Sequence, residues 1–231
     1  MIVAIEGIDG AGKRTLTEAL LAALAQAGRK AGTLAFPRYA VAPLGPAVCA
    51  MLTGDPALAP VAASARASAL MFALDRANAG PELSAAATGD AVVLVDRYVA
   101  SNAAYGAARL PVEERAAFRA WVATLELGDL ALPRPDLQIL LRVPVDVARS
   151  QARARAALDA SRAPDRYEVD DALQARVADE YELLARSGWV SPWVTVDRAE
   201  ADELKPGRAS ADHARAASVS AAVAEVMRSL R

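Results

Sequence analysis

The sequence predicts an α/β fold with a doubly wound, five-stranded parallel sheet surrounded by helices. Two observations lead to this prediction: short apolar runs alternate with longer segments of helical periodicity, and the clearest runs are apolar on both faces. The chain has 231 residues, 54% of them hydrophobic, so it can bury one core without disulfides or metals. We expect a single domain over residues 1–231, without internal repeats.

Five apolar runs are expected to form the strands. The first meets Gly7, the second is stopped by Pro37, and the third, which is the clearest, ends in Asp96. The expected strands are residues 2–5, 33–36, 91–95, 133–141 and 193–196.

Helical spacing of apolar residues fills most of the intervals between these strands. The first helix shows it in Leu16, Leu20 and Leu24, and Gly28 is placed to end that helix. We expect helices over residues 16–27, 65–79, 112–127, 145–158 and 169–187, a short helix with a loop within 40–62, and a last helix with one apolar face over 219–230. The charged and polar residues 199–212 predict a flexible connection.

Two scarce residue types exclude several kinds of site. Cys49 is the only cysteine and His213 the only histidine, so a disulfide framework and a Cys/His zinc site are both excluded. His213 lies in a polar stretch, where we expect a solvated surface role. The formal charge of −2 offers no general surface for nucleic acid or membrane, and no window resembles a membrane span or a leader peptide. We therefore expect a soluble cytoplasmic protein without nucleic-acid or membrane partners.

A glycine-rich turn between the first strand and the first helix fits the pattern G-x-x-x-x-G-K. Its glycines let backbone N–H groups surround an anion, the helix adds its positive end, and Lys13 can bridge the β- and γ-phosphates of ATP. A plain glycine-rich turn would not explain the lysine at this spacing. The fold class is therefore that of the P-loop NTPases. The residues expected at ATP are Gly7, Ile8, Asp9, Gly10, Ala11, Gly12, Lys13, Arg14 and Thr15.

The loop departs from its pattern at Arg14, which stands where the motif has Ser or Thr. The usual hydroxyl ligand of Mg²⁺ is thus missing or displaced to Thr15, or the metal is held by carboxylates and by ATP itself. Arg14 would place a second fixed cation beside the transferring phosphoryl group, where it stabilises the negative charge of the transition state.

Asp96, Arg97 and Tyr98 stand at the carboxyl end of the clearest strand. Ligands of open α/β sheets bind outside the carboxyl ends of the strands. An aspartate there can hold Mg²⁺ through water, and an arginine can grip a phosphate with two parallel hydrogen bonds. An ion pair that caps a strand is the alternative interpretation of this triplet.

Four separated segments resemble those of bacterial thymidylate kinases, in the same order along the chain. The segments are Phe36-Pro37-Arg38-Tyr39, Phe72 to Arg76, Val95 to Tyr105, and an arginine-rich stretch over 149–166 followed by Tyr167-Glu168. With the phosphate loop, the resemblance covers residues 1 to about 197. It implies Mg²⁺-dependent transfer of the ATP γ-phosphate to dTMP, giving dTDP and ADP for dTTP biosynthesis, and it implies a homodimer.

The resemblance also implies roles for individual residues. Phe72 stacks on thymine, Arg76 and Asn102 hydrogen-bond the edge of the base, and Tyr105 lies near the 2′ carbon of the sugar. The 5′-phosphate is held by Arg97 and Tyr39 with Phe36 close by, Asp9, Asp165 and Glu168 organise magnesium, and Asp165 and Tyr167 contact the substrate. Without the resemblance, Phe72 would be interpreted as a core residue and Tyr105 as packing. Gly106 departs from the family, which commonly has a polar residue there.

Five arginines lie within the predicted lid, residues 149–168. Such a run is ordinarily a solvated helix face, but a basic flap that closes over ATP would exclude water and add positive charge at transfer. Arg153 and Arg155 are both candidates for the arginine that acts at transfer; alignment with the lid of the family favours Arg155, and Arg153 is also expected at ATP.

The expected chemistry needs no histidine, because the acceptor phosphate has a second pKa of about 6 and is largely dianionic at neutral pH. Lys13, Arg14, Arg97, Asp9 and Arg155 are the expected catalytic group, acting by positioning and charge neutralisation. Two alternatives stay open at this point. One is a kinase with another acceptor, and the other is a nucleotide-gated switch, which the absence of an Asn-Lys-x-Asp motif disfavours.

Overall fold

The computed structural model describes residues 1–158, 167, 170–197, 220 and 223–228. Its sheet has five parallel strands in the order β2-β3-β1-β4-β5, which confirms the predicted fold class. The strands are β1 (Ile2–Glu6), β2 (Ala31–Ala35), β3 (Val92–Asp96), β4 (Leu137–Arg142) and β5 (Trp193–Asp197).

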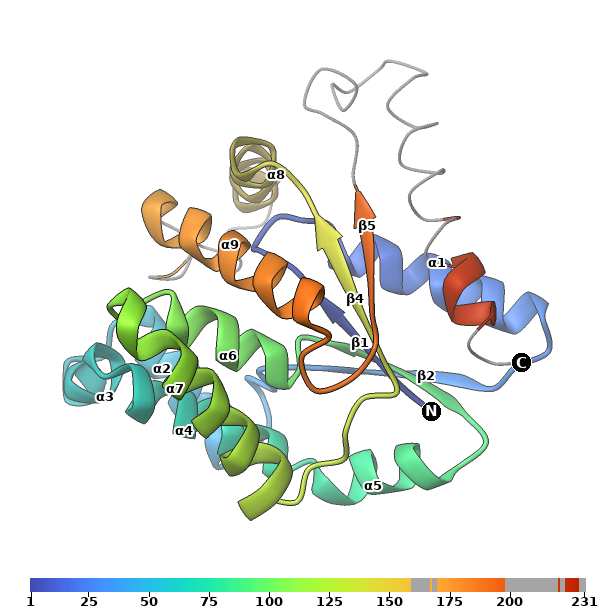
Figure 1. Cartoon of the computed structure of the whole chain (residues 1–231), viewed down its shortest axis with the longest axis horizontal. Helices are drawn as coiled ribbons and strands as arrows, with labels where there is room; N and C mark the ends of the chain where they lie inside the picture. The colour runs from blue at the N-terminus through green and yellow to red at the C-terminus, as the bar shows by residue number, and fades with distance from the viewer. Residues whose placement is uncertain (159–166, 168–169, 198–219, 221–222, 229–231) are drawn as a thin grey trace.

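Helices cover both faces of this sheet. In Figure 1 α1 lies on one side of the strands, and α4, α6, α7 and α9 gather on the other. The helices are α1 (Lys13–Gln26), α2 (Leu44–Thr53), η1 (Pro56–Leu58), α3 (Ala59–Ala63), α4 (Ala65–Ala77), α5 (Gly80–Thr88), α6 (Val99–Ala107), α7 (Val112–Ala123), η2 (Thr124–Asp129), α8 (Val145–Leu158) and α9 (Asp171–Ser187).

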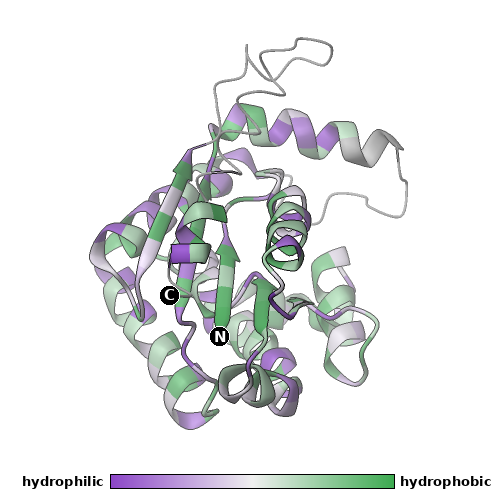
Figure 2. Ribbon diagram, turned by 90° about the vertical axis from the view of Figure 1, so that its right-hand side faces the viewer, coloured by the Kyte–Doolittle hydropathy of each residue, from purple (hydrophilic) through white to green (hydrophobic). Residues whose placement is uncertain are grey.

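The core is centred on the middle strands. Every residue of β1 is buried, whereas the edge strand β2 alternates between exposed and half-buried positions. Figure 2 shows hydrophobic colouring along the central strands. A strand that is apolar on both faces has to be covered by helices on both sides, which is the arrangement seen here.

Two helices were not predicted from the sequence, α5 and α6. All residues of α6 except Tyr105 are buried, so the helix lacks the polar face that makes helical periodicity visible. Its small residues allow close approach of α7. A Cβ atom on Gly106 would lie 2.2 Å from Cζ of Phe118, so this position has no room for a larger side chain. Packing against α7 is thus a physical reason for glycine where the family commonly has a polar residue.

Several predicted boundaries differ from the structure by one to four residues, and two of the differences have a clear form. The helix expected over 112–127 is α-helical to Ala123 and continues as the π-helix η2. β4 begins only at Leu137, because Pro133 and Pro135 cannot donate ladder hydrogen bonds. In the last predicted helix, residues 223–228 are helical, and the predicted connection over 199–212 lies outside the described residues.

Among the described residues, no single helix is long and apolar enough to cross a membrane. By length and composition alone, α2 and the segment Pro56–Ala63 are together long and apolar enough to do so, and the two parts are bent by 97° relative to each other.

The strand order places three loops at one edge of the sheet. Ile5 of β1 pairs with Asp96 of β3, and Ala35 of β2 pairs with the same Asp96. The segments that follow these strands therefore begin side by side at the carboxyl edge. This is where an open α/β sheet binds its ligands.

Candidate active site

The phosphate loop joins β1 to α1 in a conformation that depends on its glycines. Gly7, Gly10 and Gly12 have φ values of 145°, 82° and 95°, which side chains rarely adopt. A Cβ atom on Gly10 would also lie 2.0 Å from the carbonyl oxygen of Ala148 in α8. Both the backbone turn and the close contact with α8 explain why this loop needs glycine.

Lys13 begins α1 and is buried beneath the loop. Its Nζ donates to the carbonyl oxygens of Gly7 at 3.1 Å and Ile8 at 3.0 Å. Burial, reinforced by the positive charge of Arg97, lowers the pKa of Lys13 to about 8. The ammonium thus donates hydrogen bonds to two neutral carbonyl groups of the loop, and a bound phosphate would offer it a stronger partner.

Asp9 links the loop to the end of β3. Its carboxylate forms an ion pair with Arg97 and accepts hydrogen bonds from the Tyr105 hydroxyl at 2.6 Å and from Gln174 Nε2 at 3.1 Å. Burial alone would raise the pKa of Asp9, but the charges of Arg97 and Lys13 outweigh it and lower this pKa to about 2. Asp9 is thus a carboxylate at neutral pH and is fixed from three sides.

Arg97 is held in place by its backbone and by a buried carboxylate behind it. Its φ is 64°, a left-handed conformation that costs about 1 kcal/mol or more in a residue other than glycine. Glu6 accepts from the Tyr98 backbone N–H at 2.8 Å and from the hydroxyls of Ser101 at 2.6 Å and Tyr181 at 3.0 Å. Burial raises the pKa of Glu6. Arg97 Nη1 in turn lies 3.4 Å from both hydroxyl oxygens, so this network orients the guanidinium.

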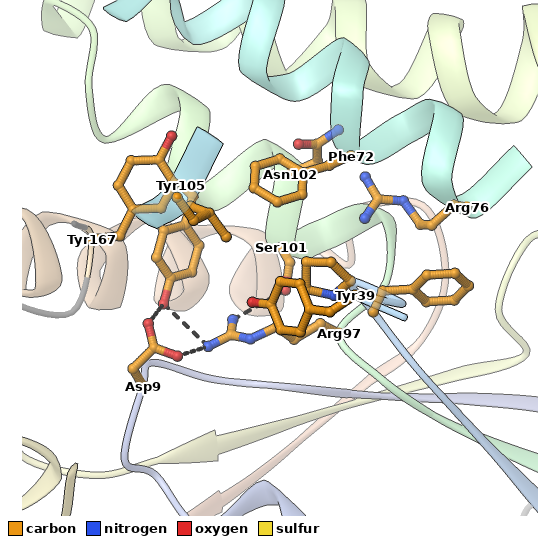
Figure 3. A pocket seen from close by; sticks show the side chains of 12 residues that line it. Asp9, Tyr39, Phe72, Arg76, Arg97, Ser101, Asn102, Tyr105 and Tyr167 are labelled. Carbon is orange, nitrogen blue, oxygen red and sulfur yellow. Dashed lines mark hydrogen bonds and ion pairs between the residues drawn. The ribbon is translucent and has the colours of Figure 1, made fainter. Parts of the chain in front are cut away.

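A cavity opens next to this charged pair, and aromatic side chains line much of it. In Figure 3, Asp9 and Arg97 lie at one end, and Phe72, Arg76 and Asn102 lie at the other. The lining residues are Asp9, Phe36, Pro37, Tyr39, Leu52, Phe72, Arg76, Arg97, Ser101, Asn102, Tyr105 and Tyr167. The cavity therefore combines an aromatic end with a cationic end beside the phosphate loop.

Comparisons with known proteins agree with this geometry. The family described as "Thymidylate kinase" matches residues 5–190. The chain belongs to the thymidylate kinase family. A thymidylate kinase of Mycobacterium tuberculosis is 46% identical over 211 residues, which is 91% of this chain and 96% of the relative. One from Xanthomonas campestris pv. campestris is 34% identical over 75% of this chain and 67% of its own length.

The solved structures give the same fold at greater distance. The thymidylate kinase of Candida albicans matches with a TM-score of 0.67 at 18% identity, over 100% of this chain and 93% of that one. The comparisons together show a P-loop phosphotransferase of this family, with ATP as co-substrate.

The structure brings most of the predicted substrate residues of the thymidylate kinase family together in one cavity. They come from the phosphate loop and from the ends of β2 and β3, from α4 and α6, and from the segment before α9. The predicted residues that line the cavity are Asp9, Phe36, Tyr39, Phe72, Arg76, Arg97, Asn102, Tyr105 and Tyr167.

Other predicted residues lie elsewhere. Arg14 is exposed and forms an ion pair with Glu18, one turn along α1, at 2.8 Å, so its side chain does not point at the cavity in this structure. Thr15 is exposed as well. Arg153 is exposed on α8, and Arg155 belongs to the same helix. Asp165 and Glu168 lie outside the described residues.

Sequence reasoning missed four polar residues around the site: Glu6, Ser101, Glu126 and Gln174. Two of them had a signal: Glu6 is an acidic residue at the end of a wholly buried strand, and Ser101 lies in the segment Val95 to Tyr105 that resembles the family. Glu126 and Gln174 lie on helices and act through side-chain contacts between distant segments, which no local pattern reveals.

The acidic groups at the carboxyl edge fit a magnesium ion. Oδ1 of Asp96 is buried without a hydrogen-bond partner, and such an oxygen is satisfied by a metal ion or its hydration water. Asp9 is ionised at the same edge of the sheet. Within the described part of the chain, no cluster of three or more His, Cys, Asp or Glu side chains forms a closed metal site. An open set of one or two carboxylates is what Mg²⁺ uses together with nucleotide phosphates.

Proposed function

We propose that the protein transfers the γ-phosphate of ATP to dTMP, giving ADP and dTDP, and so contributes to dTTP biosynthesis. The observation that carries the proposal is the position of Asp9. This residue belongs to the phosphate loop, yet it hydrogen-bonds Arg97 and Tyr105 of the aromatic cavity. Two phosphate sites therefore lie next to each other, one on the loop and one at Arg97.

The shape of the cavity supports a pyrimidine nucleotide. Phe72 offers an aromatic face at one end, and Arg76 and Asn102 offer polar groups beside it. Tyr105 lies along one side of the cavity with its hydroxyl on Asp9, which supports a position of its ring beside the sugar of a bound nucleotide. The 5′-phosphate then reaches Arg97 and Tyr39.

The chemistry is an in-line displacement at the γ-phosphorus. An oxygen of the dTMP phosphate forms the new P–O bond while the bond to the ADP oxygen breaks, and the electron pair stays on ADP. The acceptor is largely dianionic at pH 7, so no side chain has to remove a proton. The protein contributes position and positive charge through Lys13 and Arg97.

Asp9 and Asp96 are the described residues that would hold Mg²⁺, which would supply positive charge to the phosphates when bound. Arg14, Thr15, Arg153 and Arg155 are proposed at ATP on the strength of the resemblance, and so are Asp165 and Glu168 at the metal. For Arg14 this requires exchange of Glu18 for phosphate, which the exposed position of the pair permits.

We further propose a homodimer in the cytoplasm, where ATP is available. Leu70 and Leu74 are one turn apart on α4 and are 41% and 37% exposed, which is consistent with a surface covered by a second copy. Sedimentation of the purified protein at micromolar concentration tests this, and a monomer at all concentrations would contradict it.

The decisive experiment is a panel of acceptors assayed by ADP formation: dTMP, dUMP, UMP, CMP, AMP and thymidine. We expect dTMP to give the highest kcat/KM. A different preferred acceptor would overturn the proposal, and ADP formation that does not depend on any monophosphate would do so too.

A further inference from the structure

A buried carboxylate lies behind the aromatic end of the cavity. Glu126, from the π-helix η2, is fully buried. Its Oε2 accepts from Arg76 Nε at 2.5 Å, and its Oε1 accepts from Arg76 Nη2 at 2.8 Å and from Asn102 Nδ2 at 2.7 Å. Arg76 and Asn102 both line the cavity, whereas Glu126 does not.

This network fixes which way the Asn102 amide points. Nδ2 also donates to the carbonyl oxygen of Ala69 at 2.8 Å, so both of its hydrogens are used. The two partners, a backbone carbonyl and a carboxylate, are acceptors only. The NH₂ group must therefore face them, and Oδ1 is the part of the amide left to accept a hydrogen bond.

The same carboxylate leaves Arg76 as a donor. Glu126 uses Nε and one hydrogen of Nη2, and the guanidinium has three further N–H groups. Figure 3 shows the Arg76 guanidinium and the Asn102 amide on the same side of the cavity as Phe72. A base stacked on Phe72 therefore meets a donor and an acceptor next to each other.

We propose that Glu126 is a positioning residue that sets the pyrimidine specificity of the site, an inference that rests on the proposed placement of dTMP. Thymine offers an acceptor, O4, beside a donor, N3–H, which complements Arg76 and Asn102. Cytosine offers the reverse pattern, an N4 amino donor beside an unprotonated N3 acceptor. A cytosine in this cavity would leave buried polar groups unpaired, which is a strong basis for rejection.

The test compares dTMP with 5-methyl-dCMP, because these two nucleotides differ only at this edge of the base. We expect the wild-type protein to prefer dTMP by about 1,000-fold or more in kcat/KM. Comparable values for the two acceptors would overturn the inference without any variant. Failure to phosphorylate dTMP at all would instead contradict the proposed function.

Glu126→Gln then isolates the carboxylate. An amide NH₂ in place of Oε2 would face Arg76 Nε, and in place of Oε1 it would face both Arg76 Nη2 and Asn102 Nδ2. Either orientation sets donor against donor at Arg76, and one of them does so at Asn102 as well, so the fixed arrangement of the pair is lost. We expect the preference for dTMP over 5-methyl-dCMP to fall at least about tenfold, through the KM of the acceptor, with the KM of ATP unchanged. A folded variant with the wild-type preference would contradict the inference.

Two further variants separate this effect from loss of stability. Like Glu126, Glu180 is a buried glutamate that pairs with arginine. Its partners are Arg115 at 3.3 Å and Arg119 at 2.5 Å, and it lies outside the cavity. Glu180→Gln should lower stability and keep the base preference. Glu126→Asp keeps an acceptor-only carboxylate and should keep the preference within about threefold. Loss of preference in Glu180→Gln or in Glu126→Asp would count against the role of Glu126.

Discussion

Raising the pH from 7 to 9 tests whether Lys13 contacts ATP from its buried position. With a pKa of about 8 in the free protein, about 0.9 of the Lys13 side chains are protonated at pH 7 and about 0.1 at pH 9. If the ammonium is required for ATP, kcat/KM for ATP should fall about tenfold over this interval, because this ratio reports ionisations of the free enzyme. Bound phosphate favours the charged form, so kcat at saturating ATP should fall only at higher pH.

The assay is direct chromatographic measurement of ADP at saturating dTMP, which avoids the pH dependence of coupling enzymes. Burial raises the pKa of Tyr105 and of Tyr181 well above the ordinary value, so neither hydroxyl adds a transition in this range. In Lys13→Arg the fall should disappear, because a guanidinium stays protonated to pH 12. A flat wild-type profile between pH 7 and 9.5 would refute this reasoning, and so would an unchanged fall in Lys13→Arg.

Three further predictions follow from the geometry. Arg97→Ala should lower kcat about 100-fold or more in a folded protein, because it removes a fixed cation from the acceptor phosphate; near-normal turnover would contradict its role. Tyr105→Ala should reduce the preference for dTMP over ribothymidylate about tenfold, whereas Tyr105→Phe keeps the ring and the preference; equal selectivity in both variants would remove the ring from the sugar site. Gly106→Ala should lower the free energy of unfolding by about 1–3 kcal/mol in urea titrations, because its Cβ would meet the Phe118 ring. Gly80→Ala is the control, because a Cβ atom on Gly80 has no neighbour within 4 Å; an equal loss of stability in the two variants would contradict the role of packing against Phe118.

The sheet and the phosphate loop could be predicted from local sequence, because each is determined by residues that are close together along the chain. β1 is apolar throughout, and the loop pattern lies between a strand and a helix. α6 could not be predicted in this way, because burial on all sides removes its periodicity. The resemblance identified the segment that contains Asn102 and Tyr105, but it did not predict that this segment forms a helix.

The cavity was predictable where its residues lie in the segments that resemble the family. Phe72, Asn102 and Tyr105 were identified by resemblance, and the structure brings all three to one cavity. Arg14 shows that the position of a residue in a motif does not fix the direction of its side chain. Its side chain forms an ion pair with Glu18 on the exposed side of α1, although the motif position predicts it beside the phosphates.

The carboxylates behind the site were beyond prediction for a physical reason. Glu126 lies 50 residues from Arg76 and Glu6 lies 95 residues from Ser101, so no local pattern connects either pair. Both carboxylates are buried and both accept from side chains that line the cavity. A buried carboxylate without such partners would cost several kcal/mol, so its position is dictated by the donors around it. The donors in turn are held in one orientation by the carboxylate. Each of these elements is therefore a pair of donor and acceptor, and a sequence motif that contains only the residues lining the cavity contains one member of each pair.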